Sequence, residues 1–232
     1  MIDKVVAEIK KHSNKQFALH HASFFKTQKG GYGEGDLFWG IKVPALRKVS
    51  KAYYKEVTLK DVESIIGHKI HEVRLTALFI LVEKYKRASD KEKDAIAKIY
   101  FKNVKHVNNW DLVDLSAPYI AGEYFYRVSR DIQNKFANSK KLWLERIAMV
   151  STFYSLRNGN LEETFKLAKH FLNHKHDLMH KASGWLLREM GKKDIRALKI
   201  FLDKYSKIMP RTMLRYSIEK FPQKTRKKYM EK

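Results

Sequence analysis

The chain has 232 residues, of which 48 are Lys or Arg and 25 are Asp or Glu, so its formal net charge is +23. Because 44% of the residues are hydrophobic and 12% are aromatic, we expect a packed core rather than a disordered basic tail. A charge this large attracts polyanions, with nucleic acid first and acidic lipid second, and it favours a monomer because like molecules repel one another.

The composition also excludes several kinds of site. The sequence contains no cysteine, so it can form no disulfide, thiolate zinc site, iron–sulfur cluster or cysteine nucleophile. No stretch approaches the ~18 consecutive apolar residues of a membrane span, and residues 1–12 are amphipathic, without the apolar block of a signal peptide. We therefore expect a cytoplasmic protein that is neither secreted nor membrane-spanning.

Apolar residues recur at spacings of three and four rather than two, which predicts an all-α fold. One such apolar stripe, with Lys84 at its charged edge, comprises Val73, Ala77, Ile80 and Leu81. Glycine, proline, serine and asparagine interrupt the pattern and predict breaks between helices. The expected breaks lie near residues 30–36, 89–90, 108–109 and 158–160 and near Gly191 and Pro210.

The first of these breaks, residues 30–36, is rich in glycine and raises the question of a phosphate-binding loop. It lacks the Gly-Lys-Ser/Thr ending of a P-loop, and no strand precedes it as a dinucleotide fingerprint requires. We interpret the stretch as a flexible connection between helices, with backbone amides approaching a phosphate as the alternative.

Basic residues recur at the start of apolar segments with a spacing in the mid-thirties. Arg74 and Arg146 lie 72 positions apart, which is two periods of about 36, and Lys181 follows Arg146 by 35. A period of this length built from two helices predicts a HEAT-like helical-repeat solenoid that spans residues 1–232 as a single domain. Its concave face is then expected to be basic, with one such residue in each repeat. The alternative is that these cations only solvate helix ends.

The segment 108–115 places an aromatic ring and a carboxylate together. Asn109 predicts a helix N-cap, so that Trp110 is the first helical residue and Asp114 lies one turn later on the same face. Asp111 lies near the positive end of this helix, where a structural role suffices for an acid. For Trp110 and Asp114 the alternative is a core indole beside a solvated or arginine-paired acid. An acid is an odd choice for a surface that only binds phosphate, which makes this pair a candidate for chemistry.

Two further candidates lie later in the chain. The guanidinium of Arg146 suits a phosphate group, and pairing with an acid is the alternative. Trp185 follows the small residues Ala182, Ser183 and Gly184. Such neighbours allow a ligand to approach the indole closely, or allow two helices to pack closely, and the sequence leaves both alternatives open.

Four histidines, which include two i,i+4 pairs, are a possible metal motif. They are His170, His174, His176 and His180. Because the sequence lacks cysteine and an HExxH glutamate, we interpret them as surface histidines and expect no metal site. No nucleophile elbow is present either, and no cofactor is expected.

Five short motifs, taken in their order and spacing, are similar to those of one protein family. They are FWGIKVP at 38–44, WDLVD at 110–114, WLER at 143–146, ASGWLLRE at 182–189 and MPRT at 209–212. Over nearly its whole length the chain resembles the AlkD-like bacterial DNA alkylation-repair glycosylases.

The resemblance implies an array of HEAT-like helical pairs whose basic concavity holds duplex DNA. It implies a monofunctional glycosylase of base excision repair that removes N3- or N7-alkylated purines, without drawing the damaged base into a pocket as most glycosylases do. The catalytic aspartate of the family falls on Asp114, its two DNA-facing indoles on Trp110 and Trp185, and its phosphate-contacting arginine on Arg146. The other expected DNA contacts are Lys42, Arg74, Lys181, Arg188 and Arg211.

Two positions depart from the relatives and bear on lesion preference. Lys42 stands where some relatives have a neutral polar residue, and Phe24 stands where a relative has tyrosine. The alternative function is a non-catalytic HEAT-like module that binds duplex or branched DNA, or structured RNA, through the same basic face. Asp114 discriminates between the two functions, because a pure phosphate binder gains nothing from an acid there. We expect a nucleoid-associated monomer that needs no protein partner.

Overall fold

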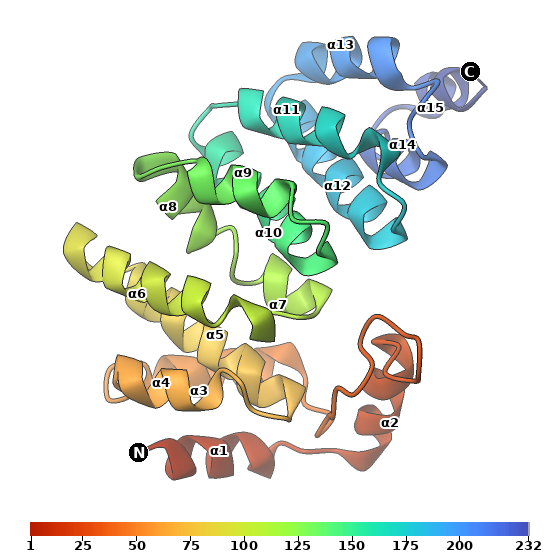
Figure 1. Cartoon of the computed structure of the whole chain (residues 1–232). Helices are drawn as coiled ribbons and strands as arrows, with labels where there is room; N and C mark the ends of the chain where they lie inside the picture. Colours follow the sequence, from red (N-terminus) through yellow and green to blue (C-terminus); the bar gives the residue numbers. More distant parts are fainter. Residues whose placement is uncertain (232) are drawn as a thin grey trace. The chain divides into compact units, whose positions relative to one another are not determined.

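The computed structural model describes residues 1–231, which form fifteen α-helices and two short 3-10 helices (Figure 1). Among these residues the only β-type pairing is one parallel bridge between Leu37 and Ile70. The all-α class predicted from the sequence is therefore confirmed. The chain folds into two compact units, Met1–Ile120 and Ala121–Lys232, and each is described by itself.

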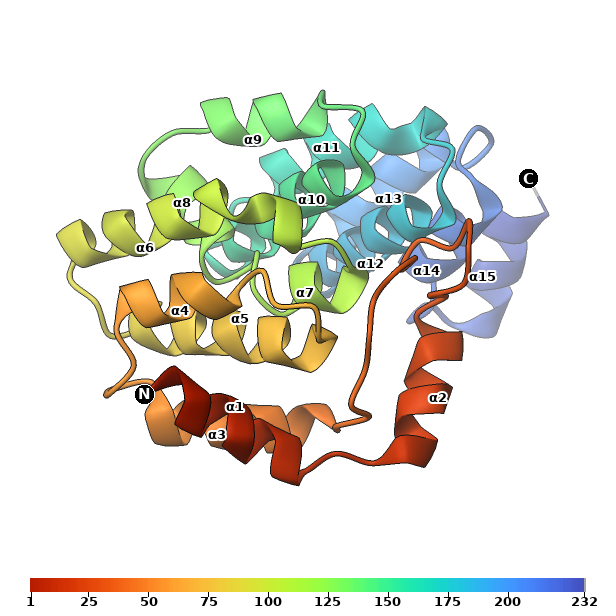
Figure 2. The same ribbon diagram turned by 60° about the horizontal axis from the view of Figure 1, so that its bottom comes forward.

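The N-terminal unit arranges its helices in two rows (Figures 1 and 2). Its elements are α1 (Ile2–Lys11), α2 (Lys15–Phe24), α3 (Val43–Tyr53), α4 (Leu59–Ile65), α5 (His71–Tyr85), α6 (Asp90–Lys102), the 3-10 helix η1 (Val104–His106) and α7 (Trp110–Asp114). Helices α3, α5 and α7 pack in succession, and α1, α4 and α6 pack against this row. This two-row packing is consistent with a helical repeat.

Helix α5 is the core of the N-terminal unit. Every one of its residues except Lys84 is buried. The stripe of Val73, Ala77, Ile80 and Leu81 is thus only part of an apolar surface that neighbouring helices cover on all sides. A helix buried in this way must also bury the polar side chains of its first turn, and each of those then needs a partner inside the protein.

Local capping signals place several helix starts where the sequence predicts them. Ser89 and Glu92 form a reciprocal capping box at the start of α6, and the Asn109 side chain accepts a hydrogen bond from the backbone N–H of Trp110 at the start of α7. The break predicted near Gly191 falls at Asp194, between α12 and α13, and Gly191 itself lies in the last turn of α12. A Cβ at Gly191 would lie 2.3 Å from a side-chain carbon of Leu198, so close packing explains this glycine.

The C-terminal unit also has two rows of helices. Its elements are α8 (Ala121–Arg127), α9 (Asp131–Ala137), α10 (Leu142–Arg157), α11 (Glu162–His170), the 3-10 helix η2 (Phe171–Asn173), α12 (Asp177–Lys193), α13 (Ile195–Tyr205), α14 (Arg211–Ser217) and α15 (Gln223–Met230). Helices α8, α10, α12 and α14 pack in succession, and α9, α11 and α13 pack against them. Within residues 1–231, no helix combines the length and apolar character needed to cross a bilayer.

The small residue before Trp185 has a packing role. A Cβ at Gly184 would lie 2.5 Å from the backbone oxygen of Met213 and 2.5 Å from the Cβ of Tyr216. Glycine therefore lets α12 approach α14, which is the second of the two alternatives that the sequence leaves open.

Candidate functional site

The first turn of α5 carries a buried carboxylate that binds the backbone of the preceding loop. Glu72 is 2% exposed and accepts hydrogen bonds from the backbone N–H groups of Trp39, Gly40 and Ile41 at 3.1, 2.8 and 3.1 Å. Gly40 has a φ of +74°, and a Cβ there would lie 2.2 Å from the backbone oxygen of Asn14. Glu72 therefore holds this loop in a conformation that glycine alone adopts without strain.

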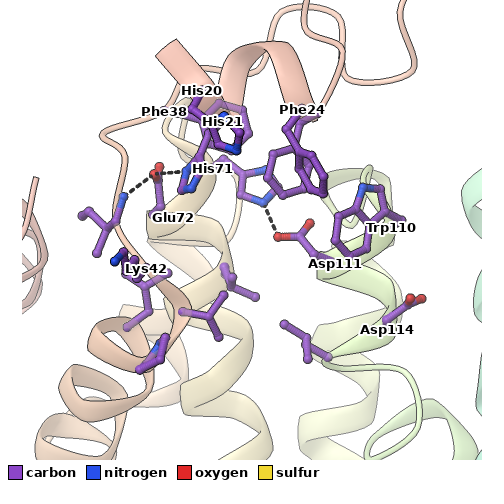
Figure 3. A pocket seen from close by; sticks show the side chains of 17 residues that line it. His20, His21, Phe24, Phe38, Lys42, His71, Glu72, Trp110, Asp111 and Asp114 are labelled. Atoms are coloured by element: carbon purple, nitrogen blue, oxygen red, sulfur yellow. Dashed lines mark hydrogen bonds and ion pairs between the residues drawn. The ribbon is translucent and has the colours of Figure 1, made fainter. Parts of the chain in front are cut away.

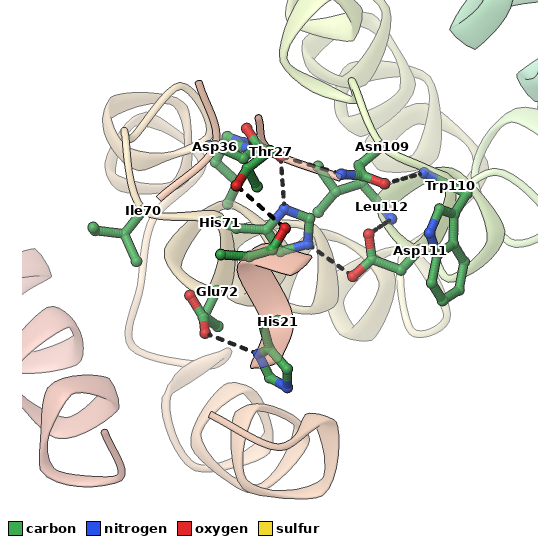
Figure 4. A network of polar contacts seen from close by, with 12 residues as sticks. His21, Thr27, Asp36, Ile70, His71, Glu72, Asn109, Trp110, Asp111 and Leu112 are labelled. Atoms are coloured by element: carbon green, nitrogen blue, oxygen red, sulfur yellow. Dashed lines mark hydrogen bonds and ion pairs between the residues drawn. The ribbon is translucent and has the colours of Figure 1, made fainter. Parts of the chain in front are cut away.

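The residue before it, His71, lies between two carboxylates (Figure 4). Its Nδ1 is 3.2 Å from an oxygen of Asp36, and its Nε2 is 2.8 Å from an oxygen of Asp111. Burial by itself lowers the pKa of this imidazole, but the charge of Asp111 and the hydrogen bonds that the ring donates to both carboxylates outweigh burial and raise the pKa to about 9. His71 is therefore a buried cation at neutral pH.

Asp36 binds two further groups in the same network. One of its oxygens accepts a hydrogen bond from the Arg74 guanidinium at 2.6 Å, and the other accepts one from the side-chain amide of Asn109 at 3.2 Å. Burial would raise the pKa of this carboxyl, but the bond to His71 and the charge of Arg74 lower it overall. The network joins the Gly-rich loop, α5 and the N-cap of α7 into one buried unit.

Helix α7 carries the aromatic and acidic pair that the sequence singles out. Asp111 points toward His71, while Trp110 and Asp114 lie together on another side of the helix (Figure 3). One face of the Trp110 indole is covered by Phe25, whose ring is 5.2 Å away at 14°. Trp110 and Asp114 are both half-buried. Asp111 has a structural role, because its carboxylate binds the buried His71.

A pocket of about 500 Å³ lies beside this pair. Its wall includes Trp110, Asp114, Glu72 and Lys42, and aromatic rings from α2 and the following loop complete it. The Phe24 ring is 54% exposed and meets the edge of Trp110 at 5.9 Å. The pocket thus combines an aromatic lining with carboxylates from two helices.

Two further predicted site residues, Trp185 and Arg146, belong to the C-terminal unit. Trp185 is half-buried on α12, where its ring is inclined by 32° to that of Phe153 at 5.8 Å. Arg146 is only 4% exposed, and its guanidinium donates a hydrogen bond to the backbone oxygen of Leu178. The structure thus gives Arg146 a partner within the protein besides any role toward phosphate.

The remaining basic residues expected at DNA differ in how accessible they are. Lys42 is exposed, with its ammonium 4.6 Å from the centre of the Phe17 ring. Arg211 is also exposed. Lys181 and Arg188 are half-exposed, and each pairs with an acid, Lys181 with Asp177 at 2.8 Å and Arg188 with Glu219.

Arg74 differs from these residues, because its guanidinium is buried and bound to Asp36 at 2.6 Å. Arg74 also donates to the backbone oxygen of His68 at 2.9 Å. These bonds favour a structural role for Arg74, since an arginine held in this way offers little of its surface to a phosphate.

The structure adds contacts to two local interpretations. None of the four histidines is buried, and they also make internal hydrogen bonds: His174 bonds to Glu145 at 3.0 Å, and His170 bonds to the backbone oxygen of Ala137 at 3.0 Å. The Gly-rich stretch connects α2 and α3, and within it Glu34 accepts a hydrogen bond from the Gly30 amide at 2.8 Å.

Sequence reasoning misses three residues of the site, namely Asp36, His71 and Glu72. None belongs to a motif that suggests chemistry, and their partners lie between 31 and 73 positions away. The available signal is the composition of α5, where an imidazole, a carboxylate and a guanidinium open a helix that is otherwise almost wholly apolar. Polar residues at such positions indicate buried partners.

The fold and the site define an all-α protein with an aromatic and acidic pocket in its N-terminal unit. A family model described as DNA alkylation repair enzyme matches residues 5–221, and the chain therefore belongs to the DNA alkylation repair enzyme family. Among solved structures, the chain is similar to a predicted DNA alkylation repair enzyme from Enterococcus faecalis, with 17% sequence identity and a TM-score of 0.70 over 91% of this chain and 98% of that one. At this identity the likeness shows a shared fold. None of the curated proteins compared with the chain matches it.

Proposed function

We propose that the protein is a monofunctional DNA glycosylase that hydrolyses the N-glycosidic bond of cationic N3- or N7-alkylated purines in duplex DNA. Its substrates would include 3-methyladenine and 7-methylguanine, and its reaction would open base excision repair. The observation that carries the proposal is the pair of Trp110 and Asp114 beside one pocket. Membership of the DNA alkylation repair enzyme family supports the class of damage.

The chemistry of the substrate decides what the enzyme must supply. Alkylation at N3 or N7 makes the purine a cation and hence a good leaving group, so the base needs no proton from an acid. As the bond between C1′ and the purine nitrogen breaks, its electron pair neutralises the purine, and positive charge develops on the sugar. A fixed anion beside that sugar stabilises the transition state.

Asp114 is the residue we assign to this role. Its carboxylate would face the developing oxocarbenium ion, orient the attacking water and accept the proton that the water loses when it bonds to C1′. At ~4 Å and an effective dielectric constant of ~20, a pair of unit charges is worth about 4 kcal/mol. That energy corresponds to about a thousandfold in rate.

Aromatic rings and cations would hold the substrate. Because Phe25 covers one face of Trp110, the remainder of the indole is available to the cationic sugar, which the ring quadrupole attracts. Trp185 would act on the sugar in the same way. The phosphate contact assigned to Arg146 would require its guanidinium, which is buried and bound to the backbone oxygen of Leu178, to become accessible when DNA binds. A mechanism that responds to charge rather than base shape does not require the base to leave the duplex.

The binding surface is also part of the proposal. Residues 1–232 would form one HEAT-like solenoid whose basic concave face holds the duplex, with phosphate contacts from exposed or half-exposed cations. The cations we assign to this face are Lys42, Lys181, Arg188 and Arg211. The protein would act as a cytoplasmic, nucleoid-associated monomer, without metal or cofactor, because a cationic leaving group removes the need for acid or Lewis-acid assistance.

The direct test is the release of bases from methylated duplex DNA. After incubation with the full-length protein, we expect 7-methylguanine and 3-methyladenine in the soluble fraction, identified by liquid chromatography and mass spectrometry. Methylated DNA without protein measures spontaneous loss, and unmethylated DNA with protein measures non-specific release. Release no faster than the spontaneous rate for both bases would contradict the proposal.

A second candidate function is a non-catalytic module that binds DNA or structured RNA, which the net charge of +23 favours. Both functions predict an affinity governed by phosphate contacts. With five such contacts, the logarithm of the affinity should fall linearly with the logarithm of salt concentration, with a slope of about −4 to −5. Fluorescence anisotropy of a labelled duplex between low and high salt measures the slope. An affinity independent of salt would point instead to a protein partner on this face.

A further inference from the structure

The protonation of His71 follows from its geometry. Each ring nitrogen faces a carboxylate, Nδ1 toward Asp36 at 3.2 Å and Nε2 toward Asp111 at 2.8 Å. A neutral imidazole has one N–H and would direct the lone pair of its other nitrogen at a carboxylate oxygen. Only the imidazolium donates to both. The raised pKa of about 9 agrees with this geometry.

The surroundings of His71 are dry and balanced in charge. The side chain is 2% exposed, and aromatic rings cover it, with Phe38 at 4.6 Å and Phe25 at 5.1 Å from its ring centre. The charged groups that face it are Asp36, Asp111 and the Arg74 guanidinium. Two anions thus meet two cations, and removing the His71 proton would leave one negative charge unpaired.

This network is attached to α7 at three points. Asp111, in the first turn of α7, accepts the bond from His71. Asp36 binds the side chain of Asn109, the N-cap of α7. Phe25 contacts the His71 ring on one side and stacks on Trp110 at 5.2 Å on the other.

Helix α7 has five residues, Trp110–Asp114, and a helix this short does not hold its own conformation in water. Tertiary contacts must therefore set the orientation of Trp110 and Asp114. Of the three attachments to the His71 network, two are hydrogen bonds at Asp111 and Asn109, and the third is the ring contact of Phe25 with Trp110.

We propose that the His71 imidazolium is a positioning residue, which holds α7 so that Trp110 and Asp114 face the substrate in the reactive arrangement. The catalytic part of this inference rests on the proposed glycosylase function, whereas the structural part does not. His71 touches neither the sugar nor the base. It acts through Asp111 and through the ring of Phe25.

The proposal predicts a dependence on pH with a definite sign. Below the pKa of His71 both carboxylates are bound and α7 is held. As the pH rises through about 9, the ring loses one N–H, Asp36 and Asp111 lose part of their compensation, and the first turn of α7 shifts. The environment of Trp110 should then change, and the rate of base release should fall.

The first experiment follows Trp110 without reference to activity. The full-length protein is labelled with 5-fluorotryptophan, and Trp110→Phe identifies the Trp110 line in the fluorine NMR spectrum. We expect this line to shift between pH 7 and 10 with a midpoint near 9 and to lose that titration in His71→Gln. His106→Gln, which changes a half-exposed histidine of the same unit, is the matched control and should retain the titration.

A second variant keeps the test decisive if His71→Gln does not fold. Asp111→Asn preserves the shape of the side chain but removes the charge that most favours the imidazolium. Its Trp110 midpoint should lie at least one pH unit below that of the unaltered protein. Two outcomes overturn the proposal. In the first, the Trp110 line of the unaltered protein is independent of pH from 7 to 10. In the second, the line titrates in His71→Gln and in Asp111→Asn as it does in the unaltered protein.

The second experiment measures single-turnover release of 7-methylguanine, corrected for spontaneous loss at each pH. In the unaltered protein the rate should decline above pH 9. In His71→Gln it should be at least tenfold lower at pH 7.5, without that decline and with a dissociation constant for DNA within twofold. A purely structural role would instead lower the folded fraction and leave the high-pH limb in place.

The two experiments separate the two proposals. If the unaltered protein releases no base, the glycosylase proposal fails, and the fluorine titration still decides whether His71 positions α7. If base is released but the Trp110 line does not depend on His71, the glycosylase proposal stands and the positioning role of His71 is wrong.

Discussion

Replacement of Asp114 by asparagine is expected to lower the single-turnover rate of 7-methylguanine release by about a thousandfold, while DNA affinity stays the same or rises. The rate falls because the amide carries no charge to face the oxocarbenium ion, and the expected size follows from about 4 kcal/mol for a close charge pair. Affinity does not fall, because removing an anion also removes its repulsion of the phosphates. Rate and dissociation constant are measured on the same methylated duplex.

The matched control for this variant is Asp3→Asn, which removes one charge from an exposed position in the first turn of α1. It should change neither rate nor affinity by more than about twofold. Circular dichroism of Asp114→Asn establishes that the helices are retained. If Asp114→Asn released base at the parental rate, the catalytic assignment of Asp114 would be wrong, and the non-catalytic binding module would become the better account.

Replacement of Glu72 by glutamine is expected to lower the free energy of unfolding by about 3 kcal/mol. Glu72 accepts three backbone hydrogen bonds through two carboxylate oxygens, whereas an amide has one acceptor oxygen and directs N–H donors at a backbone N–H. Charged hydrogen bonds are worth about 1.5–3 kcal/mol, and a buried unpaired donor costs about 1–3 kcal/mol. Urea denaturation followed by helical circular dichroism measures the change.

The same substitution at a half-exposed position provides the control. Glu63 pairs with Lys102 at 2.7 Å and its side chain is 31% exposed, so Glu63→Gln should lower the free energy of unfolding far less than Glu72→Gln does. Equal losses in the two variants would show that Glu72 does not hold the 39–41 loop as described. Because this loop leads into the pocket wall, Glu72→Gln should also slow base release more than Glu63→Gln does.

Local signals predicted the parts of this fold that depend on a few neighbouring residues. The Ser89–Glu92 capping box acts over three positions and the Asn109 cap over one, so the local sequence contains both partners of each interaction. The break predicted near Gly191 lies at Asp194, between α12 and α13. Gly191 itself lies within α12, where a Cβ would meet the Leu198 side chain of α13, and this packing between helices is not visible in the local sequence.

The same distinction applies to the candidate site: contacts within one helical turn could be predicted from the sequence, whereas contacts between distant segments could not. Trp110 and Asp114 could be paired from the sequence because four residues make about one helical turn, and the helix start was marked by Asn109. Arg74 could not be assigned in that way. Like Arg211 it precedes an apolar segment, yet it is buried against Asp36 while Arg211 is exposed.

By itself, the sequence determined the basic charge, the all-α class, the helix starts marked by caps and the face shared by Trp110 and Asp114. Only the tertiary structure decided what holds that face in place. Asp36 meets His71 from 35 positions away and Asn109 from 73, and these bonds form because α5 is buried on every side. The physical reason is range: hydrogen bonds within one turn are encoded locally, whereas the partner of a buried charge is set by which distant segments pack together.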